Sequence, residues 1–462
     1  MPRFLLQCVI RQLSAYILVG LTLFSHNVSA LNAKDVLFSY TVLGDKGAVA
    51  RVITAAATCP NIQIDGVVSA MQLRAAPDKD FPVTVCDAPI PITAKTADIN
   101  GQSLALPKGK PETILILGDT GCRLKGESVQ GCNSTAEWPF SVIADSAAKT
   151  HPDLTIHVGD YFYRESPCLE NKADCVGSPY GNNWASWEAD FFTPASNLLA
   201  SAPWVFVQGN HEKCARAGMT FFRFMDPRPM PTSCSPYTEP YAVHYMDPQL
   251  IVMDVSSSND FKVEPEQLEI FTSQFKKINQ MATKTSWLLM HAPVYAFWNR
   301  RLGDGKMQLV QGQDMLQYAS HNTFSPSLQL LIAGHIHLFE VLNFEKWHPA
   351  QLIVGNGGSL IDPPVTALRN GLEIAGMHVE YSTATNEYGF SVMTRNRNHW
   401  TLSAHNIGGS EVDKCVLGGG ILLCDSAFPK DMNALSSWFV RALLSTGNDS
   451  ATWLALAIMK QK

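Results

Sequence analysis

Two histidines at the end of an apolar run are the first residues whose types and spacing suggest metal chemistry. The run Leu328–Ala333 leads into Gly334, and His335 and His337 follow with one residue between them. Residues two apart on an extended backbone point the same way, so both imidazoles can face one site. Such a pair alone is more often a hydrogen-bonded core or surface feature, so other ligands must converge on it.

Four earlier apolar runs of strand length also lead into polar side chains that can bind metals. In chain order, Asp119 follows Thr113–Leu117, Asp160 follows Leu154–Val158, Asn210 follows Trp204–Val207 and His291 follows Trp287–Met290. Tyr163 lies three residues after Asp160, and His211 lies next to Asn210. This mixture of oxygen and nitrogen ligands suits zinc, iron or manganese better than calcium. There are too many ligands for one ion, and two metals that share a carboxylate account for the number.

The segments between these runs indicate how the side chains are positioned. Helix-compatible stretches cover Trp138–Thr150, Trp184–Leu199 and Pro265–Met281. Buried strands that alternate with helices predict an α/β fold, in which ligand groups gather at the carboxyl ends of the strands. The polar side chains can therefore meet at one edge of the fold.

The amino terminus predicts an exported protein. Arg3 and Arg11 precede an apolar stretch from Leu13 to Phe24, and the small residues Val28-Ser29-Ala30 follow it. These are the parts of a secretory signal cut after Ala30. An uncleaved anchor is the alternative, but the stretch is shorter than the ~20 residues of a spanning helix. We expect a secreted or periplasmic protein with no membrane span after signal cleavage.

Changes in the pattern of strand-like and helix-like segments divide the chain after the signal into three parts. After a signal at residues 1–30, we expect a small β-rich domain at 31–110, a catalytic domain at 111–410 and a C-terminal extension with a disulfide loop and a helix at 411–462. The formal net charge of −6 gives no general attraction to nucleic acid or anionic membranes, and no nucleic-acid-binding signature is present. An anionic substrate must therefore be captured by local positive charge.

Ten cysteines follow the expected signal, an even number that suggests disulfides in an exported chain. Pairing between neighbours closes small loops at Cys122–Cys132, Cys168–Cys175 and Cys415–Cys424, and it leaves Cys59, Cys86, Cys214 and Cys234 for wider loops. A zinc cluster is disfavoured, because no C-x-x-C spacing occurs.

The motifs resemble those of the calcineurin-like metallophosphoesterases, and in particular the purple acid phosphatase branch. In the family's order, the chain has Asp119-Thr-Gly121, Gly159-Asp-Tyr-Phe-Tyr163, Gly209-Asn-His-Glu212, Leu288-Leu-Met-His291 and Gly334-His-Ile-His337. Gly121 and Tyr163 indicate the branch, since many relatives carry D-x-H and lack the tyrosine. The resemblance implies a four-layer α/β/β/α metallophosphoesterase sandwich with a small N-terminal β-rich domain.

The resemblance also implies the ligands of two metal ions. Asp119, Asp160, Tyr163 and His337 would hold the first ion, which is ferric in that family. Asp160, Asn210, His291 and His335 would hold a second, divalent ion of zinc, iron or manganese. His211 would then be free for catalysis, either to stabilise the developing negative charge or to protonate the leaving oxygen.

The implied activity is hydrolysis of small phosphomonoesters, as in an acid phosphatase, through attack by metal-bound hydroxide. A phosphodiesterase or nucleotidase on the same metal core is one alternative. An exported binding protein with a vestigial site is another. The sequence leaves the natural substrate, the second metal and the oligomeric state open.

Several further residues could have either a functional or a purely structural role. Many plant-type relatives carry an additional substrate-contacting histidine after the His291 motif, where this chain has Tyr295. Other candidates for a phosphate contact are Arg300, Arg301 and His321, although arginines in polar loops are usually solvated. Glu212 could orient His211 or cap a nearby turn. We expect His157 to pack beneath the turn that carries Asp160, and Trp184 and Trp187 to belong to the core.

Overall fold

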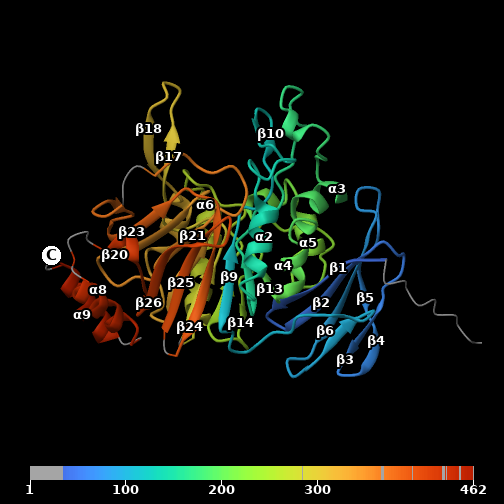
Figure 1. Cartoon of the computed structure of the whole chain (residues 1–462), viewed down its shortest axis with the longest axis horizontal. Coiled ribbons are helices and arrows are strands. Elements are labelled where there is room, and N and C mark those ends of the chain that lie inside the picture. Colours follow the sequence, from blue (N-terminus) through green and yellow to red (C-terminus); the bar gives the residue numbers. More distant parts are fainter. Residues whose placement is uncertain are drawn as a thin grey trace, which may run out of the picture.

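The structure is a computed structural model (Figure 1) that describes residues 35–460 except 284, 366–368, 398, 429–431, 433, 447 and 448. The signal expected at residues 1–30 lies outside the described residues and stays a prediction. Within the described part of the chain, no helix is both long enough and apolar enough to cross a membrane.

Two large sheets form the centre of the molecule. The first follows the order β27 (Ile421–Cys424), β26 (Glu411–Gly418), β25 (His399–Asn406), β24 (Gly389–Asn396), β9 (Thr113–Leu117), β12 (Leu154–His157), β13 (Trp204–Phe206), β1 (Val36–Gly44), β2 (Gly47–Thr54), β6 (Thr84–Ile90) and β5 (Gln72–Ala75). Its strands β9, β12, β13 and β1 are parallel. Three of the predicted ligand-bearing runs therefore lie side by side.

The second sheet carries the other two predicted runs. Its order is β14 (Tyr241–Val243), β15 (Gln249–Val252), β16 (Ser286–Leu289), β19 (Leu328–Ala333), β21 (Ala350–Val354), β20 (Phe339–Phe344), β23 (Met377–Thr385) and β22 (Glu373–Ile374). Strands β15, β16, β19 and β21 are parallel, so the residues after β16 and β19 leave the sheet at one edge.

Alternating side chains pack the two sheets face to face. In β9, Ile114 and Ile116 belong to the core between the sheets, whereas Leu115 and Leu117 face the helices on the outer side. Trp287 and the other alternate residues of β16 follow the same rule in the second sheet. This is the period of two expected for strands that are buried on both faces.

Helices cover the outer face of each sheet and complete the four layers. The first sheet is covered by α2 (Phe140–Ala148), α3 (Trp184–Trp187), α4 (Ser196–Ser201) and α5 (Gly218–Phe224), and the second by α6 (Pro265–Met281) and α7 (Asp314–Ser320). The predicted four-layer α/β/β/α sandwich is confirmed. Both Trp184 and Trp187 are buried in the outer core of the first sheet, as expected.

The helix predicted at Trp184–Leu199 is broken into three pieces. A π-helical segment, Glu188–Phe192, follows α3 directly, and α4 begins only at Ser196. Pro194 stands between them, and proline lacks the N–H group that a continuing helix requires. The stretch expected to be helix-compatible is thus helical over most of its length, but its helix type changes along the chain.

The N-terminal region is rich in strands, as predicted, but it is not separate from the sandwich. Strand β1 pairs with β13, and β2, β6 and β5 continue the first sheet. Only β3 (Asn61–Ile64), β4 (Val67–Ala70), β7 (Ala97–Ile99) and β8 (Gln102–Ser103) form a sheet of their own. The boundaries at residues 110 and 410 stay predictions.

The C-terminal part adds an edge and two helices at the opposite end of the molecule from the N-terminal strands (Figure 1). Strands β26 and β27 extend the first sheet, and α8 (Ala434–Leu444) and α9 (Asp449–Lys460) pack beside them. Two hairpins, β10 (Leu124–Lys125) with β11 (Ser128–Val129) and β17 (Phe297–Arg301) with β18 (Met307–Gln311), project from the sandwich.

Neighbouring cysteines are paired throughout the described chain. The five disulfides are Cys59–Cys86, Cys122–Cys132, Cys168–Cys175, Cys214–Cys234 and Cys415–Cys424. The predicted neighbour pairing is confirmed.

Candidate metal centre

The carboxyl ends of five parallel strands meet at one edge of the sandwich, where the two sheets approach each other. The loops after β9, β12 and β13 arrive from the first sheet, and the loops after β16 and β19 arrive from the second. The structure brings together all eight residues predicted for the site: Asp119, Asp160, Tyr163, Asn210, His211, His291, His335 and His337.

Glycines precede the ligands because neighbouring loops occupy the space that a side chain would need. A Cβ at Gly209 would collide with the carboxylate of Asp160, and a Cβ at Gly334 would collide with the carboxylate of Asp119. Gly159 has a φ of 104°, and a Cβ there would lie against the ring of His291. The strand–glycine–ligand pattern in the sequence thus reflects crowding at the centre.

Three of the predicted ligands adopt a left-handed backbone conformation. Asp119, Asp160 and His335 have φ values of 55°, 60° and 72°. This conformation is uncommon outside glycine and concentrates at functional sites. Hydrogen bonds between the loops hold it: the Asp119 N–H donates to Gly159, and the His335 N–H donates to the Asp119 carboxylate at 2.9 Å.

The first group of donor atoms surrounds the phenol of Tyr163. Its Oη lies 3.1 Å from Asp119 Oδ1, 2.7 Å from Asp160 Oδ2 and 2.9 Å from His337 Nε2. His337 Nε2 also lies 3.3 Å from Asp119 Oδ1. These are the four residues that the resemblance assigns to the first ion.

The second group of donor atoms surrounds the amide oxygen of Asn210. Asn210 Oδ1 lies 3.0 Å from His291 Nε2 and 3.1 Å from His335 Nδ1, and His291 Nε2 lies 3.2 Å from Asp160 Oδ2. Ligand atoms of Asp160, His291 and His335 all lie within 4.8 Å of one another. Asp160 Oδ2 therefore contacts both groups.

The spacing of these atoms fits coordination of cations. Ligands about 2.1 Å from an ion in an octahedral site lie about 3 Å from each other, which is the spacing seen here. Without metal ions, protons on the Tyr163 phenol and on the His291 ring must take their place between these electron-rich atoms. The donor set therefore fits two ions that share the Asp160 carboxylate.

Partners outside the centre leave one ring nitrogen of each histidine for a metal. His291 Nδ1 lies 2.8 Å from the Val158 carbonyl oxygen, and His337 Nδ1 lies 2.6 Å from the Leu360 carbonyl oxygen. Each of these nitrogens must carry the proton, so each Nε2 lone pair points into the centre. Such outer partners fix the tautomer and orientation of metal-binding histidines.

Asp260 orients the ring of His335 in the same way, and no sequence motif marks this aspartate. Asp260 Oδ2 lies 3.1 Å from His335 Nε2, which leaves Nδ1 free to face Asn210. Asp362 also supports the centre, but through the backbone: its carboxylate accepts the His337 backbone N–H at 2.8 Å. Both aspartates come from irregular loops with no recognisable motif.

The pKa values reflect a buried, electron-rich centre. Burial lowers the pKa of His291, but the charge and hydrogen bond of Asp160, the charge of Asp119 and the Val158 carbonyl together outweigh it and raise this pKa to about 10. Burial raises the pKa of the Tyr163 phenol well above its usual value, and the charges of Asp160 and Asp119 add to this effect. The surrounding charge favours positive ions at this place.

Glu212 fixes the turn that carries Asp160. Its buried carboxylate accepts backbone N–H groups of Asp160 at 3.0 Å, Tyr161 at 2.9 Å, Phe162 at 3.1 Å and Gly209 at 3.2 Å. Of the two roles open from the sequence, capping a turn is the one that the structure shows.

His211 lies beside the centre and contacts a different carboxylate. Its Nε2 is 3.9 Å from Asp160 Oδ2, and its ring centroid is 3.8 Å from that of Tyr163. Its Nδ1 lies 2.7 Å from Glu165 Oε1 and 3.0 Å from a guanidinium nitrogen of Arg216, which itself pairs with Glu165. Glu165 and Arg216 were missed from the sequence, since neither belongs to a motif.

The other residues for which the sequence allowed either a functional or a structural role lie away from the predicted metal ligands or pack beneath them. The buried Tyr295 bonds to Asn322 and His348, and Arg300 and Arg301 are exposed on β17. Among the described residues, no hydrogen bond or ion pair joins these residues or His321 to the predicted ligands. The expected packing of His157 beneath the turn that carries Asp160 is confirmed, because its buried ring bonds to Thr120 and stacks on Tyr161.

Comparison with known proteins agrees with this geometry. The model of the calcineurin-like phosphoesterase family matches residues 112–339. Purple acid phosphatase 1 of Ipomoea batatas is 26% identical over 165 residues, which cover 34% of this chain and 32% of that protein. Probable purple acid phosphatase 20 of Arabidopsis thaliana is 24% identical over 245 residues, which cover 50% of this chain and 51% of that protein. The chain thus spans about half or less of the length of these curated relatives.

Two solved structures share the fold. Purple acid phosphatase PPD1 from yellow lupin has a TM-score of 0.52 at 12% identity, covering 82% of this chain and 73% of that chain. The structure of PhoD has a TM-score of 0.53 at 12% identity, covering 95% of this chain and 100% of that chain. These two structures show the fold, and the match to the calcineurin-like phosphoesterase family covers residues 112–339. The resemblance to the purple acid phosphatase branch, expected from the motifs, is confirmed.

The shared position of Asp160 predicts that one substitution empties both metal sites. An amide in Asp160→Asn keeps the shape but loses the negative charge that two cations would share, so both metals should be lost together. Elemental analysis of the purified variant measures this, with Asp145→Asn at an exposed position as the matched control. Two full metal equivalents in Asp160→Asn would contradict a shared carboxylate.

The contacts of Glu212 predict a loss of stability in Glu212→Gln. An amide offers one accepting oxygen, so backbone N–H groups in the turn lose their acceptor at a cost of about 1–3 kcal/mol. Urea unfolding of the metal-free protein measures the change in unfolding free energy, with exposed Glu170→Gln as control. Equal stability of the two variants would show that Glu212 does not hold the turn.

Proposed function

We propose that this protein is an exported, dinuclear-metal phosphomonoesterase of the acid phosphatase type. One observation carries the proposal: Asp160 Oδ2 contacts the donor atoms of Tyr163 on one side and of His291 on the other. When bound, two cations at these groups would polarise the phosphate oxygens and activate a water molecule.

The protein's own residues have separate tasks in this reaction. Asp119, Asp160, Tyr163 and His337 would hold one ion, and Asp160, Asn210, His291 and His335 would hold the other. His211 stands at the rim with Nδ1 against Glu165, and burial lowers its pKa to about 3. An anionic phosphate beside the ring would raise this pKa, so that Nε2 could take up a proton and give it to the leaving oxygen. No nucleophilic serine or cysteine is needed.

The phenol of Tyr163 supports ferric iron as the first ion. Its pKa is raised by burial and by two carboxylates, so only a strongly charged cation would stabilise the phenolate. A hard anionic oxygen suits ferric iron, whereas the imidazole-rich second group suits a divalent ion such as zinc, iron or manganese.

Export is the proposed location because five disulfides persist only in an oxidising compartment. The expected signal at residues 1–30 is consistent with secretion or transfer to a periplasm.

A paired assay tests the reaction and the rival diesterase function. Metal-loaded protein should hydrolyse 4-nitrophenyl phosphate with a higher kcat/KM than bis(4-nitrophenyl) phosphate. The opposite preference would favour a phosphodiesterase. Loaded protein that hydrolyses neither ester would favour a binding protein with a vestigial site.

Tyr163→Phe tests the first ion. A phenolate bound to ferric iron absorbs visible light, so the substitution should remove the visible band while the fold, followed by circular dichroism, is retained. Tyr180→Phe, at an exposed position, is the matched control. A band that is undiminished in Tyr163→Phe would refute ligation by this phenol.

A further inference from the structure

We propose that Arg123, Lys125 and Lys213 form a binding site for a second anionic group of the substrate. The preferred substrate would then be a small phosphoester that carries a second phosphoryl group. This inference rests on the proposed function, because the three cations lie beside the metal centre.

Two of the cations, Arg123 and Lys125, flank Leu124, the first residue of β10. Leu124 is buried, its N–H donates to the Tyr163 carbonyl at 3.0 Å, and its carbonyl accepts the Glu165 N–H at 2.9 Å. Residues on either side of it share the opposite face of an extended strand. Arg123 and Lys125 therefore lie together next to the segment that carries Tyr163 and Glu165.

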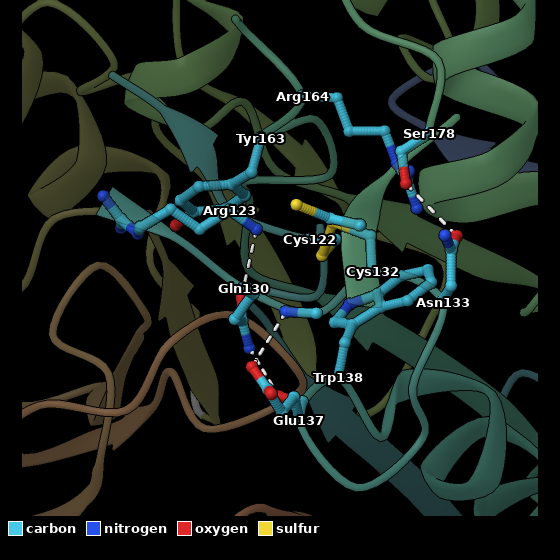
Figure 2. Close-up of a disulfide and its surroundings, with 12 residues drawn as sticks. Cys122, Arg123, Gln130, Cys132, Asn133, Glu137, Trp138, Tyr163, Arg164 and Ser178 are labelled. Carbon is cyan, nitrogen blue, oxygen red and sulfur yellow. Dashed lines mark hydrogen bonds between the residues drawn. A yellow bond between two sulfur atoms is a disulfide. The ribbon is translucent and has the colours of Figure 1, made fainter. Parts of the chain in front are cut away.

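Arg123 reaches the metal centre directly. Its guanidinium lies over the ring of Tyr163, 4.9 Å from the ring centroid, and Figure 2 shows the two side chains alongside each other. Gln130 holds the backbone of Arg123 by accepting its N–H at 3.0 Å. A substrate phosphate at the centre would thus have a positive group at its border.

The third cation arrives from another loop. Lys213 is two residues after His211, in the segment that also supplies Arg216. The ring centroid of His211 lies 3.8 Å from that of Tyr163, the ring that the Arg123 guanidinium covers. Glu165, whose N–H bonds to the Leu124 carbonyl beside Lys125, contacts His211 Nδ1 at 2.7 Å. These contacts bring the loops of all three cations to the same border of the centre.

None of the three cations is engaged in an ion pair with a described carboxylate. Arg216 is paired with Glu165, but in the described part of the chain no carboxylate forms an ion pair with Arg123, Lys125 or Lys213. The acids nearest to Arg123 are Asp119 and Asp160 of the centre, whose charge bound metal ions would offset. The three cations would then be free to pair with an anionic group of the substrate.

Disulfides hold both loops that carry these cations. Cys122, next to Arg123, is bonded to Cys132, and Cys214, next to Lys213, is bonded to Cys234 (Figure 2 shows the first). The charges are thus held in place before a ligand arrives, which lowers the entropic cost of binding. Flexible surface lysines that serve only solubility do not need such anchoring.

Binding of two non-hydrolysable ligands tests the inference without catalysis. Isothermal titration of metal-loaded protein compares propane-1,3-diylbisphosphonate with propylphosphonate, which lacks the second anionic group. We expect the bisphosphonate to bind about tenfold more tightly, as two added charge pairs would give, and we expect the advantage to shrink at high salt.

The double variant Lys125→Ala/Lys213→Ala should reduce this advantage to about twofold or less. The matched control Lys276→Ala/Lys306→Ala removes two exposed lysines elsewhere and should keep it. Equal affinity of the two ligands for the unmodified protein, or an advantage unchanged in the Lys125/Lys213 variant, would overturn the inference.

Hydrolysis of 4-nitrophenyl phosphate by the same preparations separates the two proposals. Protein that prefers the bisphosphonate but hydrolyses no ester contradicts the phosphatase function and leaves the anion site supported. Protein that hydrolyses the ester but shows no bisphosphonate preference supports the function and refutes the anion site.

Discussion

The convergence of electron-rich atoms around the Asp160 carboxylate is the constraint on which this structure depends. Two carboxylates, a phenol, an amide oxygen and three ring nitrogens face one another in a buried space. Such a cluster is costly without compensating positive charge. The sandwich tolerates it because both sheets end there, and because Val158, Leu360 and Asp260 direct the histidine lone pairs inward.

Backbone features of the loops make this convergence possible. Left-handed turns at Asp119 and Asp160 bend the chain sharply at the strand ends, and Gly209 and Gly334 allow the neighbouring carboxylates to approach. The buried carboxylate of Glu212 ties the Asp160 turn to the loop after β13. The buried Asp190 accepts the N–H groups of Cys122 and Tyr163, and so it joins the loop after β9 to the segment that carries the phenol. Strain at the centre is thus held by hydrogen bonds from several elements.

Features that depend on local pattern could be predicted, and features that depend on contacts between distant loops could not. Thr113–Leu117, Leu328–Ala333 and Pro265–Met281 were predicted with the observed bounds, because periodicity and flanking residues define them. The prediction that the site residues lie together was possible because the carboxyl ends of parallel strands meet at one edge of a sheet. The pairing of β1 with β13, by contrast, leaves no trace in either strand's own sequence. Glu165 and Asp260 were missed for the same reason, since each reaches its histidine only through the tertiary fold.

The central claim is that two cations share the carboxylate of Asp160. Anomalous diffraction from crystals of the metal-loaded protein tests it most directly. The account predicts two peaks about 3.5–4 Å apart, one beside Tyr163 and His337 and the other beside Asn210 and His291, with Asp160 between them. A single peak, or two peaks of which Asp160 contacts only one, would contradict it.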